Sequence, residues 1–347
     1  MNSWFTSHDD RSALSNVATS SHRVWRTTIA GYVLAFACLI WVFRDFDLAG
    51  LLRRVEKMNA SWIVAAILCY VVSYVCQGVR WQLLLRPLST VTVLSTTKAI
   101  YAGLFVNDVL PLRLGEVARA ALISRWTALK LRSIIASILI ERLCDGLWLA
   151  VGVAAVMALV PLPRRLIEVG DAFAIAILVA LIAFSLLLFG ARTKWAKSVV
   201  PQASDTPRPL ITTLITFLRG ALLDLRNVSY GLNAVLACIF SLVMLQLQGL
   251  SLWFVMRAYG LDVSVAAGLA VFLIMHLGTM VPAAPANVGT YQFFTVLGLT
   301  LFGVDKTTAV GFSLVAFGIL NIPLLVIGFW AFASSGLTLL EVRSGVT

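Results

Sequence analysis

The sequence predicts an all-α integral membrane protein, a polytopic helical bundle of about six full spans with two re-entrant helical hairpins. Of its 347 residues, 60% are hydrophobic and only 12% are charged. Soluble globular proteins have about 45–50% apolar and about 25% charged residues. A mean hydropathy of +0.93 exceeds what one soluble core can bury. These values exclude an ordinary soluble enzyme and a disordered chain.

Four consecutive regions are expected along the chain. Residues 1–26 form a polar, Ser- and Thr-rich cytoplasmic tail that is too long for a secretory signal. Residues 27–160 form the first half of the membrane domain, 161–230 a linker, and 231–347 the second half. Since a spanning helix needs about 20 apolar residues, the clear full spans are 27–43, 62–85, 133–160, 171–190, 231–256 and 307–333.

Three further stretches differ from full spans. Residues 93–121 and 264–303 are apolar but interrupted by Pro, Gly, Asn and charged residues, which predicts two re-entrant segments. Residues 208–226 place Leu and Ile on one face and Thr and Arg elsewhere, which is typical of a helix lying on the membrane surface. A cytoplasmic amphipathic helix packed on the bundle fits the same pattern.

The formal net charge is +11, from 27 Lys and Arg against 16 Asp and Glu. The basic residues fall between apolar segments, so they indicate topology and contact with anionic lipid headgroups rather than nucleic acid binding. With six crossings, the cytoplasmic segments carry 18 Lys and Arg and the outer segments carry 8. This bias predicts a multi-pass protein of the inner (plasma) membrane with both termini in the cytoplasm.

The two interrupted stretches resemble each other. Pro111 to Gly115 and Pro285 to Gly289 share the spacing P-x3-G at an offset of 174 residues. Three crossings separate them, so the halves would have opposite orientations, as in the inverted repeats of transporters. Chance is the alternative, since Pro and Gly are common in membrane helices. Two hairpins are therefore expected to enter from opposite faces and line a cavity. Their expected hinges are Pro111, Gly115, Pro282, Pro285 and Gly289.

Polar and charged residues concentrate in the first interrupted stretch, at Asn107, Asp108, Arg113, Glu116 and Arg119. Steps of three residues from Arg113 to Glu116 and on to Arg119 predict one shared helical face. Since guanidinium groups bind phosphate oxygens in a bidentate manner, we expect a pocket for a lipid headgroup. A cytoplasmic loop with exposed salt bridges is the alternative.

A second charged group lies inside the third span, at Glu141, Arg142 and Asp145. Arg142 follows Ser133 by 9 residues, or about 13 Å at the rise of an α-helix, which places it near the centre of the bilayer. Charges at this depth are costly, and they usually pair and serve function. We expect this group to guide a headgroup past the midplane; a buried ion pair that fixes helix packing is the alternative.

Weaker signals come from other polar residues. Asn287 and Gln292 lie in the second interrupted stretch and are candidates for substrate binding, whereas His276 is expected to be a packing residue. Arg80 precedes Trp81 at the inner end of the second span. This pair would place an aromatic residue of the membrane interface beside a phosphate anchor.

Several chemistries have no motif in the chain. It contains no P-loop, H-E-x-x-H, G-x-S-x-G or paired C-x-x-C, which are the common patterns of nucleotide, zinc and nucleophile sites. The five cysteines all lie inside apolar segments. We therefore expect no metal, no cofactor, no catalytic residue and no disulfide framework.

Four motifs carry a family resemblance: Arg80-Trp81, the run from Asn107 to Glu116 with Arg119, Glu141-Arg142-x-x-Asp145, and the P-x-x-P-x-N-x-G element that ends at Gly289. Together they resemble the lysylphosphatidylglycerol synthase transmembrane-region family, the flippase-like membrane proteins, over about residues 28–335. The resemblance implies a bundle with two re-entrant segments that moves a lipid between leaflets. Full-length synthases carry an additional aminoacyl-transferase domain, so the resemblance here implies the flippase part without synthesis of lysyl-lipid.

We therefore expect a flippase-like transporter that moves a polar, phosphate-bearing lipid between the leaflets of the bacterial inner membrane. The partners would be membrane lipids, whether phospholipid, glycolipid or hopanoid. Two alternatives stay open. One is a membrane-embedded lipid-modifying or glycosyl-transferring enzyme that uses Asp108, Glu116 or Asp145 as a general base. The other is a scaffold for a separate lipid-modifying enzyme, without transport of its own.

Overall fold

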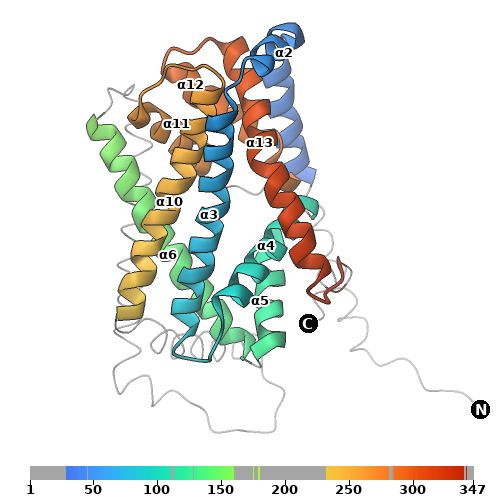
Figure 1. The fold of residues 1–347 in the computed structure, drawn as a ribbon, viewed down its shortest axis with the longest axis vertical. Helices are drawn as coiled ribbons and strands as arrows, with labels where there is room; N and C mark the ends of the chain where they lie inside the picture. The colour runs from blue at the N-terminus through green and yellow to red at the C-terminus, as the bar shows by residue number, and fades with distance from the viewer. Residues whose placement is uncertain are drawn as a thin grey trace, which may run out of the picture.

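The fold was analysed in a computed structural model, which describes residues 29–44, 46–110, 113–127, 129–159, 232–280 and 284–339, together with 175, 179 and 341. Every regular element in this part of the chain is a helix, and no strand occurs there (Figure 1). The predicted all-α class is therefore confirmed. The expected tail 1–26, span 171–190 and surface helix 208–226 lie outside the described residues, apart from 175 and 179.

The chain enters the bundle through two helices that meet at a sharp bend. The helix Ile29–Phe43 is followed by α2 (Leu48–Glu56) at an angle of 81°. Asp47 lies at this bend and is the N-cap of α2, because its side chain accepts a hydrogen bond from the Gly50 amide. Such an N-cap satisfies one of the free amides that begin every helix.

Four helices follow in the first half: α3 (Ala60–Leu85), α4 (Val93–Val109), α5 (Gly115–Thr127) and α6 (Leu131–Leu159). Asn59 caps α3 through the Ser61 amide, and Thr92 caps α4 through the Ser95 amide. The Thr92 cap explains why a new helix begins at Val93, at the start of the predicted stretch 93–121. With 17 and 13 residues, α4 and α5 are about 25 and 20 Å long, shorter than the apolar core of a bilayer, which is about 30 Å thick.

The second half contains a matching series: α10 (Leu232–Ala258), α11 (Val265–Gly278), the 3-10 helix η2 (Pro285–Asn287), α12 (Thr290–Leu301) and α13 (Lys306–Ala333). The helices α10, α11, α12 and α13 begin 172 to 175 residues after α3, α4, α5 and α6, respectively. Ser264 caps α11 and Asp305 caps α13. The short helices again stand in the stretch that was expected to be interrupted, 264–303.

The two series pack against each other along the whole bundle. Helices α3 and α10 lie side by side at its centre, α13 packs on α4, and α6 packs on α11. In Figure 1 the short helices α4 and α5 lie toward the lower end, whereas α11, α12 and α2 lie at the upper end. Buried side chains of α10, α11, α12 and α13 form the largest apolar cluster, and a second cluster surrounds α4 and α5.

Three of the described helices, α3, α10 and α13, are long and apolar enough to cross a membrane, and the bent pair Ile29–Phe43 with α2 would be a fourth. They correspond to the predicted spans 62–85, 231–256, 307–333 and 27–43. Helix α6 has 29 residues and covers the predicted span 133–160, but it carries charged side chains near its middle. The molecule is thus a multi-pass membrane protein.

Glycines allow unusually close contacts where the short helices begin. A Cβ atom on Gly115 would lie 1.9 Å from the carbonyl oxygen of Gly103, so α5 crosses α4 at a point where neither helix has a side chain. Gly289 precedes α12 with a φ angle of +91°, a conformation that favours glycine, and a Cβ atom there would lie 2.4 Å from the Ala35 carbonyl oxygen. Pro111 and Pro282 lie outside the described residues.

Candidate functional site

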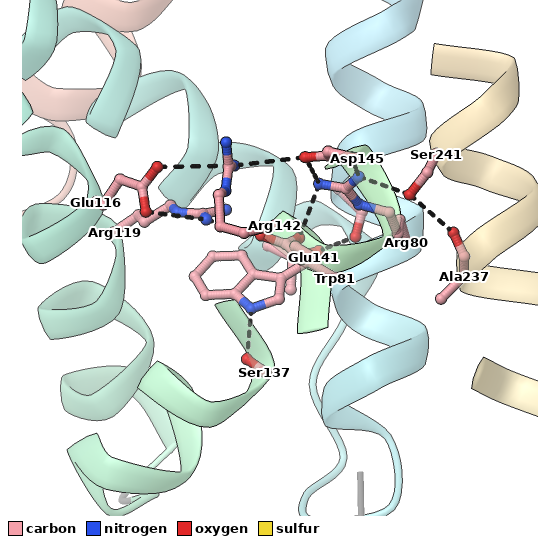
Figure 2. A network of polar contacts seen from close by, with 12 residues as sticks. Arg80, Trp81, Glu116, Arg119, Ser137, Glu141, Arg142, Asp145, Ala237 and Ser241 are labelled. Carbon is pink, nitrogen blue, oxygen red and sulfur yellow. Dashed lines mark hydrogen bonds and ion pairs between the residues drawn. The ribbon is translucent and has the colours of Figure 1, made fainter. Parts of the chain in front are cut away.

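A network of charged side chains lies in the interior of the bundle, between α3, α5, α6 and α10 (Figure 2). Its fixed centre is Arg80 in the last part of α3, whose side chain is fully buried. The Arg80 guanidinium donates hydrogen bonds to Asp145 and, over 2.8 Å, to the Ser241 hydroxyl of α10. It also lies 3.4 Å from Glu141 Oε1. One arginine therefore joins α3 to both α6 and α10.

Arg119 of α5 forms the second buried pair. Its Nη2 atom lies 2.7 Å from Glu141 Oε2, and its guanidinium stacks over the Trp81 ring at 4.7 Å from the centroid. Trp81 is itself fully buried and donates from Nε1 to the Ser137 hydroxyl at 2.9 Å. This arrangement holds Glu141 between two arginines, and it holds Arg119 on an aromatic face that favours cations.

Arg142 and Glu116 form the open edge of the network. Arg142 Nη2 lies 3.7 Å from Glu116 Oε1 and 3.8 Å from Asp145 Oδ2, and the two side chains of the first pair are 46% and 39% exposed. Glu116 also lies 3.9 Å from Arg119. These distances exceed those of a direct charge-assisted hydrogen bond, about 2.7–2.9 Å. Arg142 is therefore held by two loose contacts and keeps an accessible guanidinium.

The network is balanced in charge, with the three arginines facing Glu116, Glu141 and Asp145. Pairing is what makes buried charges tolerable, because removing one partner leaves the other uncompensated. Two buried donors, Arg80 Nε and Arg119 Nη1, still have no hydrogen-bond partner among the described residues. The buried acceptor Glu141 Oε1 likewise has no hydrogen-bond partner there, and each unpartnered buried polar atom costs about 1–3 kcal/mol.

Arg113 does not lie on the face that its spacing predicted. Helix α5 begins at Gly115, and Arg113 precedes it with a φ angle of +53°, so the expected step from Arg113 to Glu116 on one helical face is wrong. Its guanidinium instead donates to the carbonyl oxygen of Thr279, the C-cap of α11. Arg113 thus links the first interrupted stretch to the second.

The remaining polar residues of the first interrupted stretch differ in role. Asn107 accepts a hydrogen bond from the Gly115 amide at 2.7 Å, which ties the end of α4 to the start of α5. Asp108 is half-buried on the same turn and forms no hydrogen bond or ion pair with the residues that the structure describes. Asn107 therefore shapes the hairpin.

Asn287 and Gln292 hold the backbone of the second interrupted stretch. Gln292 accepts a hydrogen bond from the Gly289 amide at 2.7 Å, and the Asn287 carbonyl accepts one from the Thr290 hydroxyl at 3.0 Å. Pro285 begins η2, which packs on α4. His276 packs against the Phe272 ring. His276 lies within electrostatic reach of Asp145 and Arg142, whereas Asn287 and Gln292 form no ion pair or hydrogen bond with the charged network among the described residues.

The expectation for Trp81 was wrong. We expected an aromatic residue at the membrane interface, but Trp81 is enclosed between α3, α5 and α6. Sequence reasoning also missed Ser137 and Ser241, which are buried hydroxyl groups in otherwise apolar helices. Their position in long apolar segments was the available signal. Among the described residues, no group of His, Cys, Asp and Glu side chains is placed to hold a metal ion.

Comparison with known proteins identifies relatives along nearly the whole chain. The family model described as "Lysylphosphatidylglycerol synthase TM region" matches residues 28–328. A UPF0104 membrane protein of Methanothermobacter thermautotrophicus is 25% identical over 320 residues, which cover 88% of this chain and 89% of the relative. A UPF0104 membrane protein of Methanocaldococcus jannaschii is 21% identical over 303 residues, covering 84% and 90%.

Proposed function

Because the chain belongs to the lysylphosphatidylglycerol synthase TM-region family, we propose that it moves a polar, phosphate-bearing lipid between the leaflets of the inner membrane. The observation that carries this proposal is the ionic network of Arg80, Arg119, Glu141, Arg142 and Asp145 in the interior of an apolar bundle. Its open edge at Arg142 and Glu116 is where a headgroup can enter.

The energetic cost of the network argues for a role beyond stability. An arginine at the centre of a membrane helix costs about 2.5–3.5 kcal/mol on insertion scales. Well-packed apolar side chains often replace a buried ion pair without loss of stability. A bundle that needed only to fold would gain little from three arginines in its interior. The network is thus better explained by an anionic ligand than by packing.

The difference in burial and contacts among the three arginines supports the same proposal. Arg80 and Arg119 are buried and fixed by close contacts to Asp145 and Glu141. Arg142 is half-exposed and held only at 3.7 and 3.8 Å. A phosphate can replace these loose contacts with two parallel hydrogen bonds to the guanidinium. Glu116 would then be free to accept an ammonium or hydroxyl group of the headgroup, while Asp145 stays paired with Arg80.

The route across the membrane follows from the matched halves. We propose that α3 to α6 and α10 to α13 are an inverted repeat, because the helices correspond at an offset of 172 to 175 residues and the short pairs lie at opposite ends of the bundle. Arg113 on Thr279 and η2 on α4 join the two interrupted stretches. In such transporters the substrate binds where the repeats meet, and rocking of the halves exposes it alternately to each side.

The proposed topology places both termini in the cytoplasm, with α4 and α5 toward that side and α2, α11 and α12 toward the other. Transport of this kind involves no covalent step and needs no cofactor. Lipid identity is limited to headgroups that offer a phosphate to Arg142.

Reconstitution tests the proposal directly. The purified protein is incorporated into vesicles that contain fluorescent analogues of anionic, zwitterionic and glycosylated phospholipids, and leaflet exchange is followed by dithionite quenching. We expect at least one phosphate-bearing analogue to exchange faster than in protein-free vesicles. If none does, the chain is not an autonomous flippase and the scaffold function becomes the better account. Chemical change of a lipid during the assay would instead favour the enzyme.

A further inference from the structure

A second charged site lies at the other end of the bundle, away from α4 and α5. A cavity of about 520 Å³ opens between α2 and the start of α13. Figure 1 places these two segments side by side at the upper end of the molecule. Three cationic side chains of the α2 region, Arg53, Arg54 and Lys57, line the cavity. None of them belongs to the ionic network in the interior.

The three cations in this cavity outnumber the two carboxylates beside them, which leaves a net positive charge. Asp47 and Asp305 also line it, but each accepts a hydrogen bond from a backbone amide at a helix start, at 3.0 and 3.1 Å, respectively. No ion pair joins either carboxylate to Arg53, Arg54 or Lys57 within the described part of the chain. The carboxylates therefore act as helix caps, and the cations remain available to an external anion.

The arginine side chains are held in place by neutral groups. Arg54 Nη2 donates to the Thr308 hydroxyl at 3.2 Å, and its guanidinium lies 5.8 Å from the centroid of the Tyr259 ring. Arg53 donates from Nε to the Ala49 carbonyl at 3.3 Å. Each of these contacts uses one part of the guanidinium and leaves other N–H groups free. Positioned donors of this kind favour bidentate binding of phosphate oxygens.

The face of α2 opposite these cations is apolar, and it indicates that the cavity lies at the depth of lipid headgroups. Leu48, Leu52 and Val55 are exposed large apolar side chains that follow one another at helical spacing. Since α2 turns by 81° from the helix before it, α2 lies across the end of a spanning helix. An amphipathic helix in this orientation buries its apolar face at the boundary between headgroups and acyl chains. Its cations then stand among lipid phosphates.

We propose that the cavity between α2 and α13 is a second binding site, which takes the phosphate oxyanion of an anionic headgroup in the leaflet where α2 lies. This inference stands on elements separate from the interior network, and it holds whether or not the lipid is transported. Arg53, Arg54 and Lys57 bind the phosphate, and α2 anchors the site in the interface.

Equilibrium binding to the purified protein in a neutral maltoside detergent tests this site. The protein is titrated calorimetrically with dihexanoyl phosphatidylglycerol and, separately, with sodium phosphate at constant ionic strength. Arg53 and Lys57 are exposed, so the double variant R53Q/K57Q is expected to fold, which size-exclusion chromatography and circular dichroism check. Should the double variant fail to fold, K57Q alone provides the comparison. Arg257, which lies at the end of α10 and pairs with Asp262, does not line the cavity, so R257Q is the matched control.

We expect R53Q/K57Q to bind the short-chain lipid at least about tenfold more weakly than the wild type, with R257Q within about twofold. If the wild type also binds sodium phosphate and the double variant loses this binding, the site accepts the free oxyanion. If only lipid binding is lost, the site requires the lipid. Equal binding by wild type and double variant, or an equal loss in R257Q, overturns the proposal. Because the readout is binding, it is independent of the result of the vesicle assay.

Discussion

At the scale of single residues, two arginines of the interior network are fixed and one is loose. Arg80 joins three helices through Asp145, Glu141 and Ser241, and Arg119 rests between Glu141 and the Trp81 ring. Arg142 has only longer contacts. A fixed pair that positions carboxylates, beside a loose cation that can exchange partners, suits the reversible binding of an anion that we propose.

Replacement of Arg80 by leucine should destabilise the protein strongly. The change leaves Asp145 without its buried arginine, and it leaves Glu141 with one arginine partner instead of two. Loss of one member of a buried ion pair costs about 3–5 kcal/mol. Chemical unfolding in detergent micelles measures this loss. As a control, Arg257→Leu removes a pair whose carboxylate, Asp262, is 99% exposed, and it should change the free energy of unfolding by less than about 1 kcal/mol. An R80L variant as stable as R257L would show that the network does not hold the helices together.

The sequence identified most members of this network but not its geometry. Glu141, Arg142 and Asp145 stand out because charges inside an apolar span are rare. The central place of Arg80 could not be read in the same way, since an arginine beside a tryptophan is common at helix ends. Its burial depends on Asp145 and Ser241, which are 65 and 161 residues away. Only the packing of α3 on α6 and α10 brings them together.

At the scale of elements, the interrupted stretches owe their shape to positions where only glycine fits. Gly289 combines a positive φ angle with close contact to the backbone at Ala35, so it fixes the start of α12 against the helix Ile29–Phe43. Gly115 has a similar role where α5 crosses α4. The short helices are thus held at defined positions rather than packed loosely on the spanning helices.

A matched pair of glycine substitutions separates backbone strain from close packing. Gly289 and Gly260 both have positive φ angles, but a Cβ atom on Gly260 would meet nothing within 4 Å. Gly260→Ala should therefore cost only the conformational strain, about 1–2 kcal/mol. Gly289→Ala should cost more than this, because the Ala35 carbonyl must also move. Unfolding midpoints of the two variants give the comparison, and equal losses would show that the Gly289 contact is unimportant.

The spacing of proline and glycine predicted where the helices break but not what the breaks contact. The shared P-x3-G pattern marks the two stretches because both residue types end or redirect helices. The placement of Arg113 was predicted incorrectly, because a helix beginning at Gly115 cannot include it on one face with Glu116. Its partner, the Thr279 carbonyl, lies 166 residues away, and no local pattern specifies a backbone acceptor.

At the scale of the whole molecule, the bundle carries two charged sites at different levels. The interior network lies between α3, α5, α6 and α10, whereas the α2 cavity lies at the end opposite α4 and α5. We propose that these ends lie on opposite sides of the membrane. A lipid that passes the network would therefore reach the leaflet in which α2 presents its cations.

Labelling of single cysteines tests this assignment of sides. In a chain whose five cysteines are replaced by serine or alanine, Glu56→Cys at the end of α2 and Arg125→Cys near the end of α5 are compared in whole cells with a membrane-impermeant maleimide. Both positions are exposed in the structure. We expect Glu56→Cys to react in intact cells and Arg125→Cys to react only after permeabilisation. Reaction of both from the same side would contradict the opposed ends and the inverted repeat.

The most direct test of the central claim is the rate of lipid exchange in vesicles that contain the Arg142→Leu variant. Since Arg142 contributes only loose contacts to the fold, this variant should fold as the wild type does. Loss of a charge-assisted hydrogen bond, about 1.5–3 kcal/mol, corresponds to a rate about 10- to 100-fold lower. Arg142→Lys keeps the charge but not the planar guanidinium, so its exchange rate should lie between those of the wild type and Arg142→Leu. Arg257→Leu should exchange lipid at the wild-type rate. A well-folded Arg142→Leu variant that exchanges lipid at the wild-type rate would contradict the claim that this arginine carries the headgroup.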